Sequence, residues 1–171
     1  MTEILISRFR RWFEYEQNSH ARVLASFETV PATSRSAEAF QQALDLMGHV
    51  VAARKLWLYR LGGLAEKPVV FPKTVTLDEL PAQFEAMHAA WSDYLNSVTD
   101  DDLVKIFEYQ SLDGRRFRNT VEDILAQLFG HSWYHRGQVA SRIKAIGGTP
   151  AVTDLVFWSR ELIEEPDTLG G

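Results

Sequence analysis

Apolar residues recur three or four positions apart along most of this chain, and that spacing predicts helices. The first predicted helix covers residues 2–30, and its apolar positions are Leu5, Phe9, Trp12, Val23 and Phe27. Pro31 follows where such a helix is expected to stop, because proline interrupts the backbone hydrogen bonds of a helix.

The second predicted helix begins after a serine cap, at Ser34 or Ser36, and ends at the pair Gly62 and Gly63. Its middle, residues 46–61, is apolar on most sides, which is typical of a helix covered by several neighbours. Residues 64–76 contain two prolines and show no period, so we expect a connecting loop there. A third helix with one apolar stripe is predicted over residues 77–98.

The next stretch, residues 104–119, predicts a small β-hairpin. Ile106, Phe107 and Tyr109 favour strands, and Asp113 followed by Gly114 is a strong turn signal.

A fourth helix should follow, because Thr120 with Asp123 three residues later resembles a capping box. This helix is expected to stop at Gly147 and Gly148. A short helix is predicted over residues 153–162, and residues 164–171 form a loose tail.

Together these elements predict an all-α fold, an antiparallel four-helix bundle with a short C-terminal helix and a small β-hairpin between the third and fourth helices. The chain has 171 residues, a length that suits one domain, which we place at residues 1–163.

Charge and composition narrow the function. The formal net charge of −5 supplies no general attraction for a polyanion, so general nucleic-acid binding is disfavoured. The chain has no cysteine, which excludes disulfides, thiolate metal sites and a cysteine nucleophile. It shows neither a signal peptide nor an apolar run near the ~18 residues of a membrane span. We therefore expect a cytoplasmic protein with no membrane partner.

Two histidines, His131 and His135, stand four residues apart in the fourth predicted helix. This spacing places both imidazoles on one helix face, about a turn apart, where they can share a metal ion. With ~100° per residue, both fall on the stripe that carries Leu128 and Val139 and should face the core. Two buried imidazoles without a partner would be costly, and a shared cation would remove that cost. The alternative is a pair of ordinary hydrogen-bonded histidines.

His49 lies in the covered part of the second helix, where a third imidazole can meet the other two. Three histidine ligands leave coordination positions open, which is typical of a reactive metal site. Zn²⁺, Ni²⁺ and Fe²⁺ all suit such a site. No catalytic residue and no organic cofactor site can be assigned from the sequence.

The sequence gives weaker indications of a role for the other two histidines. His20 lies on the inner stripe of the first helix, where it is either a hydrogen-bonded neighbour of the metal ligands or an interfacial histidine with its own partner. His88 stands at the margin of the third helix. Near the ligands, Arg136 and Gln138 are expected to flank the site, whereas Tyr134 should point away.

Two segments carry a family resemblance: His49 with the following VVAARKLWLYRLGG, and HSWYHRGQVASRIKAIGGTPAVTDLVFW from His131 to Trp158. They resemble the DinB family, within the wider superfamily of YfiT-like proteins and small-thiol-dependent transferases. The resemblance implies a four-helix bundle with a divalent metal held by His49, His131 and His135. One departure is Asn18-Ser19-His20, where such proteins often carry an aromatic-small-Asn run.

The resemblance also implies an activity: transfer of a small thiol to an electrophile, or hydrolysis, with a low-molecular-weight thiol as a possible co-substrate. The alternative is a non-catalytic metal-binding or stress-response module. A ferritin-like di-iron protein is disfavoured because Glu-x-x-His occurs once, at residues 85–88, and neither a P-loop nor His-Glu-x-x-His is present. We also expect a homodimer, since five tryptophans exceed what one small core readily buries.

Overall fold

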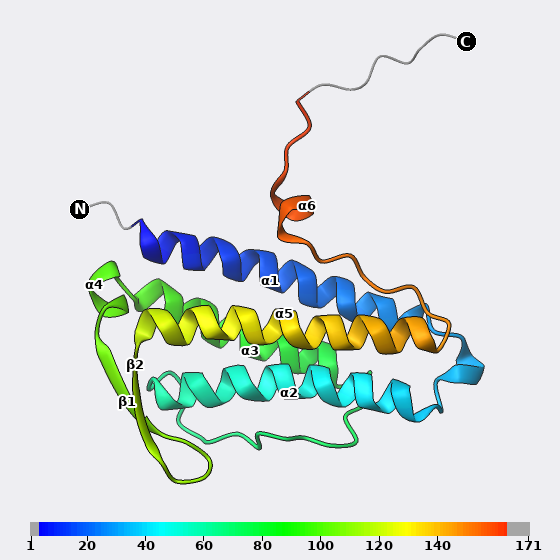
Figure 1. Cartoon of the computed structure of the whole chain (residues 1–171), viewed down its shortest axis with the longest axis horizontal. Helices are drawn as coiled ribbons and strands as arrows, with labels where there is room; N and C mark the ends of the chain where they lie inside the picture. The colour runs from blue at the N-terminus through cyan, green and yellow to red at the C-terminus, as the bar shows by residue number, and fades with distance from the viewer. Residues whose placement is uncertain (1–3, 164–171) are drawn as a thin grey trace.

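Four long helices lie side by side along one axis in the computed structural model, which describes residues 4–163 (Figure 1). They are α1 (Leu5–Glu28), α2 (Glu38–Arg60), α3 (Leu80–Ser97) and α5 (Val121–Ala145). The shorter elements are the 3₁₀ turn η1 (Ala32–Ser34), helices α4 (Asp100–Leu103) and α6 (Leu155–Ser159), and strands β1 (Ile106–Gln110) and β2 (Arg116–Thr120). The fold is therefore mostly helical, as predicted, with one small hairpin.

The directions of the long helices differ from the predicted antiparallel order. Helices α1 and α2 each pack against both α3 and α5. Neighbours run antiparallel in the pairs α1/α3 and α2/α5, but parallel in α1/α5 and α2/α3 (Figure 1). The reason is the connection formed by residues 61–79, which runs back alongside α2 before α3 begins. A short connection would have forced α3 to run opposite to α2.

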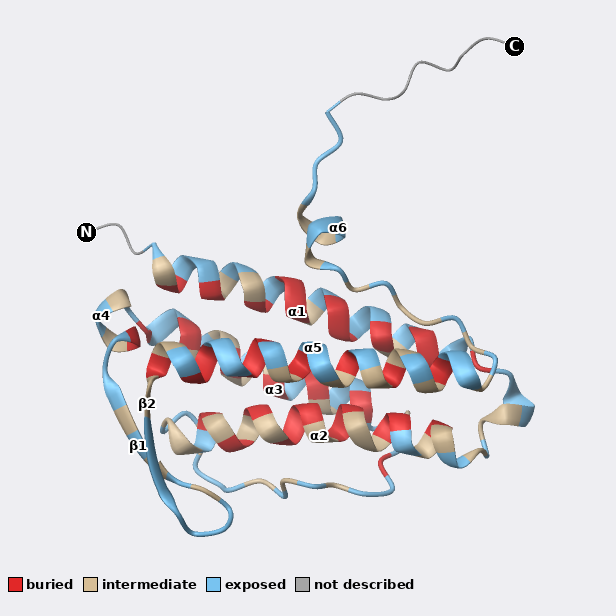
Figure 2. Cartoon of the chain, viewed as in Figure 1, coloured by how far each residue is buried: buried red, intermediate tan, exposed pale blue. Residues whose placement is uncertain are grey.

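The core lies between the inward faces of these four helices, where the buried residues gather (Figure 2). Large side chains there are fully buried: Phe27, Met47, Leu80, Trp91 and Leu128. Within residues 4–163, no helix combines the length and apolar character needed to cross a membrane.

Glycines end α2 and α5 as predicted. Gly62 and Gly147 have φ angles of 83° and 86°, in the left-handed region that a side chain disfavours. The next residue in each case, Gly63 or Gly148, donates its N–H to the carbonyl five residues earlier, at 2.8 and 2.9 Å. This pairing satisfies helix carbonyls that would otherwise lack a partner.

The hairpin and the start of α5 are also confirmed. Strands β1 and β2 pair antiparallel from Ile106 opposite Thr120 to Gln110 opposite Arg116, and Gly114 in the turn has φ 86°. The Thr120 hydroxyl accepts the N–H of Asp123 at 3.0 Å and so caps α5.

Other boundaries differ from the predictions. Helix α2 begins at Glu38, because Ser34 belongs to a 3₁₀ turn and Ala37 takes the cap position without a side-chain bond. Helices α3 and α6 are shorter than expected. Helix α4 was not predicted, although Thr99 and Asp102 form a capping box that marks its start. The predicted loose tail at residues 164–171 lies outside the described residues.

A carboxylate distant in sequence caps the first helix. Asp100 in α4 accepts the backbone N–H groups of Ile4, Leu5 and Ile6 at 2.9, 3.3 and 2.7 Å. These are the N–H groups that the start of a helix leaves without an intrahelical partner. Asp100 therefore fastens the beginning of α1 to the end of α3.

Candidate metal centre

Three half-buried histidines meet between α2 and α5: His49, His131 and His135. Their candidate ligand nitrogens all lie within 4.8 Å of one another. The Nε2 atoms of His131 and His135 are 3.1 Å apart, and the His49 ring centre lies 5.1 Å from each of the other two rings. The structure thus brings together the three residues that the sequence selected.

Hydrogen bonds orient two of these rings. Nδ1 of His49 lies 3.0 Å from the carbonyl oxygen of Val70, and Nδ1 of His135 lies 3.0 Å from Oε1 of Gln138. Both partners are acceptors, so each Nδ1 carries the proton and each Nε2 presents a lone pair. Outer partners of this kind fix the ring of a metal-binding histidine. The set of converging lone pairs fits a divalent cation.

The electrostatics favour neutral rings. Burial lowers the pKa of His131 to about 4, helped by the neighbouring His135 and His49. Burial also lowers the pKa of His135, although its bond to Gln138 acts in the opposite direction. Histidine binds a metal only when it is deprotonated, so these pKa shifts keep the nitrogens available at neutral pH.

The connection between α2 and α3 covers one side of the site. Phe71 stacks on His49, with ring centres 5.1 Å apart and planes 9° from parallel. Val75 anchors the segment, since its N–H donates to Asp45 at 3.0 Å and its carbonyl accepts from Gln41 at 2.9 Å. Gly48 permits this close approach, because a Cβ there would lie only 2.7 Å from Cγ2 of Val75.

A groove of about 400 Å³ opens beside the histidines. Its walls include His49 and His135, the loop residues Phe71, Pro72 and Lys73, and Arg142 of α5. The groove is large enough to admit a small organic molecule next to two of the three imidazoles.

The remaining histidines form a separate pair. His20 is fully buried, and its Nδ1 lies 3.0 Å from Nε2 of His88. Burial, with the nearby Arg54 and Arg136, lowers the pKa of His20 well below its usual value, and burial lowers that of His88 to about 4. His20 is thus an interfacial histidine with its own partner. His88, which the sequence placed at the margin of its helix, is that partner.

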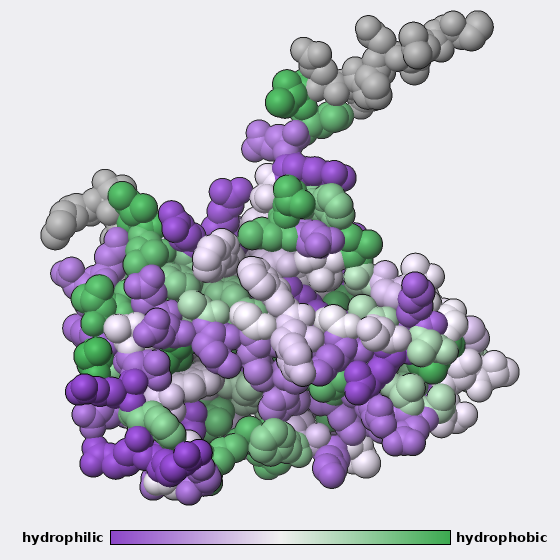
Figure 3. Space-filling view, viewed as in Figure 1, coloured by the Kyte–Doolittle hydropathy of each residue, from purple (hydrophilic) through white to green (hydrophobic). Residues whose placement is uncertain are grey.

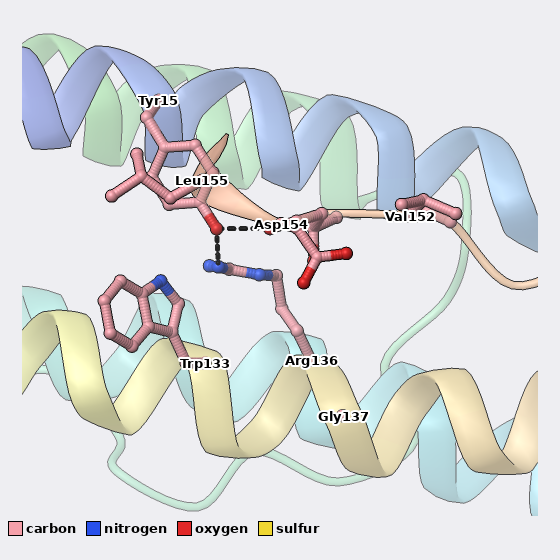
Figure 4. A pocket seen from close by; sticks show the side chains of 9 residues that line it. Tyr15, Trp133, Arg136, Gly137, Val152, Asp154 and Leu155 are labelled. Atoms are coloured by element: carbon pink, nitrogen blue, oxygen red, sulfur yellow. Dashed lines mark hydrogen bonds between the residues drawn. The ribbon is translucent and has the colours of Figure 1, made fainter. Parts of the chain in front are cut away.

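Gln138 flanks the site as expected, but Arg136 does not. Arg136 turns toward α1, where its Nη2 donates to the Tyr15 hydroxyl at 2.9 Å, and that hydroxyl donates to the carbonyl of Thr153 (Figure 4). These residues line a larger hollow of about 570 Å³ on a different face of α5, which contains none of the histidines. Tyr134 is 65% exposed, in agreement with its predicted outward direction, although its ring edge packs against His135.

Sequence reasoning missed the loop residues of the site. Val70, Phe71 and Lys73 lie in a segment without periodicity, so no pattern places their side chains. The single signal was composition: Phe71 and its neighbours are apolar residues in a loop that also contains two prolines.

Comparison with known proteins relates the chain to a sequence family and to solved structures. The chain matches the sequence model of the DinB family over residues 2–166. It is similar to the crystal structure of a DinB-like protein from Bacillus cereus, with a TM-score of 0.64, 21% sequence identity, and coverage of 84% of this chain and 94% of that chain. At this identity, the structural match shows a shared fold. Among curated proteins, none matches the sequence.

Proposed function

Since the chain belongs to the DinB family, we propose that it is a metal-dependent enzyme acting on a small molecule, with His49, His131 and His135 as ligands of one divalent cation. The observation that carries this proposal is the groove beside the three histidines. A purely structural metal usually has all its positions filled by protein, whereas three histidines leave positions for a substrate.

Zn²⁺, Ni²⁺ and Fe²⁺ fit the three-nitrogen set equally. When bound, such an ion would lower the pKa of a water molecule or thiol beside it and would so supply a nucleophile at neutral pH. Because the chain has no cysteine, a thiol must come from a second substrate. The proposed reaction is transfer of a low-molecular-weight thiol to an electrophile, or hydrolysis.

The chain's own residues would position the reactants. Val70 and Gln138 hold the rings of His49 and His135 in the orientation that presents Nε2. Phe71 covers the outer face of His49 and limits the access of water. The substrate would then enter through the groove, on the side of the histidines that Phe71 leaves uncovered.

A non-catalytic metal-binding or stress-response module is the second candidate. One observation favours it: the single carboxylate of the groove, Asp45, already holds Gln41 and Val75. Among the residues that line the groove, no carboxylate therefore has both oxygens free to act as an acid or base beside the histidines.

Metal analysis tests the site. Protein purified without chelator should contain about one divalent ion per chain, and a His135→Ala variant should contain almost none. His88→Ala is the control, because His88 lies with His20 outside the site. Equal metal content in wild type and His135→Ala would remove His135 from the ligand set.

Turnover tests the activity. Metal-loaded and chelated protein should be compared against a panel of electrophiles with several small thiols. We expect turnover with the loaded protein alone. Turnover that survives verified metal removal contradicts the proposed mechanism, and no turnover with any thiol or hydrolysable compound favours the non-catalytic module.

We also infer that the four long helices form one four-helix bundle, because each of α1 and α2 packs on both α3 and α5 around a shared core. The proposed location is the cytoplasm, which accords with a chain free of cysteine and of candidate spanning helices within residues 4–163.

The proposed assembly is a homodimer. Trp133 and Phe157 are 45% and 46% exposed, and Leu162 and Ile163 more so. The segment after α6 projects away from the long helices, and hydrophobic residues lie along it (Figures 1 and 3). Contact with a second copy would bury these side chains. Light scattering at tens of micromolar should give twice the chain mass of 19.5 kDa, and a monomer alone would contradict the dimer.

A further inference from the structure

The charged residues of the groove differ from the acidic balance of the chain. Lys73 and Arg142 line it with one carboxylate, Asp45, although the chain carries a net charge of −5. Oδ1 of Asp45 accepts from the Gln41 amide and from the Val75 N–H and so helps to hold the loop, while the single negative charge of this carboxylate offsets one of the two cations. The groove is left with an excess of positive charge.

The partners of Arg142 are neutral. Its Nε donates to Oε1 of Gln42 at 3.3 Å, and its Nη1 donates to the carbonyl of Gln138 at 3.2 Å. Within residues 4–163, no carboxylate lies within ion-pair distance of Arg142 or Lys73. Arg142 is half-buried and Lys73 is exposed. Cations without a counterion in the protein attract an anion from solution.

Arg142 places one of these positive charges close to the histidines. Arg142 lies seven residues after His135 on α5, which places it two turns along the same face. Its side chain reaches back to Gln138, the residue that binds Nδ1 of His135. The guanidinium therefore lies roughly one turn, on the order of 5 Å, from His135 along the helix axis.

The groove also has apolar walls. Leu46, Phe71 and Pro72 line it together with the cations and the histidines, and Gln42 is its one neutral polar side chain. Such walls favour a flat or aliphatic body over a strongly hydrated one.

We propose that the groove selects substrates that carry a carboxylate at one end of an apolar body. Arg142 and Lys73 bind the carboxylate, and the reactive atom at the other end faces His49, His131 and His135. Arg142 supplies the directional contact, because a planar guanidinium pairs with a carboxylate through two hydrogen bonds, while Lys73 adds a mobile charge from the loop. This selectivity rests on the proposed metal-dependent function, since the histidines define where the reactive end lies.

A matched pair of probes tests the proposal. Both 4-sulfanylbenzoate and 4-sulfanylbenzamide have a thiol across one aromatic ring from the polar group, and the carboxylate alone is charged. Titration into Co²⁺-loaded protein, followed by the thiolate-to-cobalt absorption band, gives both affinities. We expect the benzoate to bind about 10-fold more tightly than the amide, the size of one charge-assisted hydrogen bond.

Variants assign the effect to residues. In Arg142→Gln the preference should fall to within about 2-fold, and in Lys73→Gln it should weaken without vanishing. Lys144→Gln is the control, because Lys144 is an exposed cation of α5 outside the groove and its loss should leave the preference unchanged. Thermal unfolding of each variant checks that the fold persists.

The outcomes separate the two proposals. If cobalt binds but the two probes bind equally, or neither binds, the substrate proposal fails while the metal site stands. If Lys144→Gln removes the preference as fully as Arg142→Gln, the effect is general charge and the assignment to the groove fails. If the protein takes up no cobalt, the proposed function fails, and the substrate proposal fails with it.

Discussion

Glu16, Arg54 and Arg136 form a charge cluster at the centre of the helices, with side chains at most 3% exposed. Arg54 of α2 donates to Oε2 of Glu16, and Nη1 of Arg136 lies 3.8 Å from Oε1. The Arg54 guanidinium also lies against aromatic rings of α1, α3 and α5. One carboxylate thus compensates two buried cations, and their removal from water makes that compensation essential.

Glu16→Gln should therefore destabilise the protein by about 3–5 kcal/mol, because it leaves two guanidinium groups buried without a counterion. Urea unfolding measures the change. Glu14→Gln, an exposed position on the same helix, should stay within about 0.5 kcal/mol of wild type. If both variants lose the same free energy of unfolding, the buried cluster contributes no more to stability than an exposed glutamate does.

Gly48→Ala should weaken metal binding about 10-fold, because the new Cβ meets Val75 and Pro72 and displaces the loop that orients His49. Gly130→Ala is a matched control, since a Cβ there meets nothing within 4 Å. Both changes raise helix propensity by up to about 1 kcal/mol, so the comparison isolates the loop contact. A competition titration with a chelator gives the affinities, and equal values in the two variants would exclude the loop from the site.

Single residues were predictable where chemistry and periodicity coincided. His131 and His135 have the spacing of a metal-binding pair, and the covered setting of His49 indicated the third histidine of the cluster. Arg136 was misplaced because adjacent helix residues point about 100° apart, which turns it toward α1 while His135 faces α2. The available signals for the buried cluster were the place of Glu16 on the inward stripe of α1 and that of Arg54 in the mostly apolar residues 46–61.

At the scale of elements, Asp100 shows how a four-residue helix supports a long one. Three backbone N–H groups at the start of α1 bond to this carboxylate. The bond from Ile6, more than those from Leu5 and Ile4, lowers the pKa of Asp100 below its usual 3.8. The charged form is thus preferred in the folded protein.

A carboxyl whose pKa is lower in the folded state stabilises the fold above its unfolded pKa, and that contribution disappears as the pH falls through the folded pKa. Asp100→Ala should lower the unfolding temperature at pH 7 by roughly 2–4 °C, the size of a lost helix cap in a domain of this length. The difference from wild type should shrink as the pH falls below about 4. Calorimetry across this range is the measurement.

Asp101→Ala is the control for this cap. Asp101 is the next residue of α4 and is exposed, and it makes none of the bonds to α1. If its loss lowers the unfolding temperature as much as that of Asp100, the capping bonds are not the cause.

Elements with strong local signals were predicted well. Periodic apolar stripes located the four long helices, and glycine or threonine signals marked several of their ends. The start of α2 was missed because Ser34 lies in a 3₁₀ turn and the cap position falls on Ala37, whose side chain gives no capping signal. Helix α4 is too short for periodicity to reveal, so its capping box was the one available indication.

At the scale of the molecule, the clustered histidines come from two helices, and His49 stands 82 residues before His131 in the sequence. An ion that binds them binds the folded chain and not the unfolded one, so it stabilises the fold. At 100 times its dissociation constant, the ion should add about 2.7 kcal/mol and raise the unfolding temperature by roughly 5–10 °C.

Thermal unfolding with and without Zn²⁺ checks this stabilisation. His88→Gln should respond to the ion as wild type does, whereas His49→Gln should not respond. A shift that persists in His49→Gln would place the stabilising ion elsewhere on the protein.

Local sequence patterns could not predict the relative directions of the helices. Periodicity predicts that a helix exists but says nothing about which way its neighbour runs. Here the order depends on residues 61–79, whose length allows the chain to return along α2 before α3 begins. The same return path is what brings Phe71 and Val70 to His49.

Because of that return path, the candidate metal centre consists of a helical part and a loop part, which differ in how much substitution they tolerate. The histidines stand on packed helices, where a displaced backbone would disturb the core. Phe71, Pro72 and Lys73 stand on a surface connection, which tolerates substitution and changes of length far better. Substitutions in this one short segment, through evolution or by design, can therefore change which molecules enter the groove while the three histidine nitrogens stay in place.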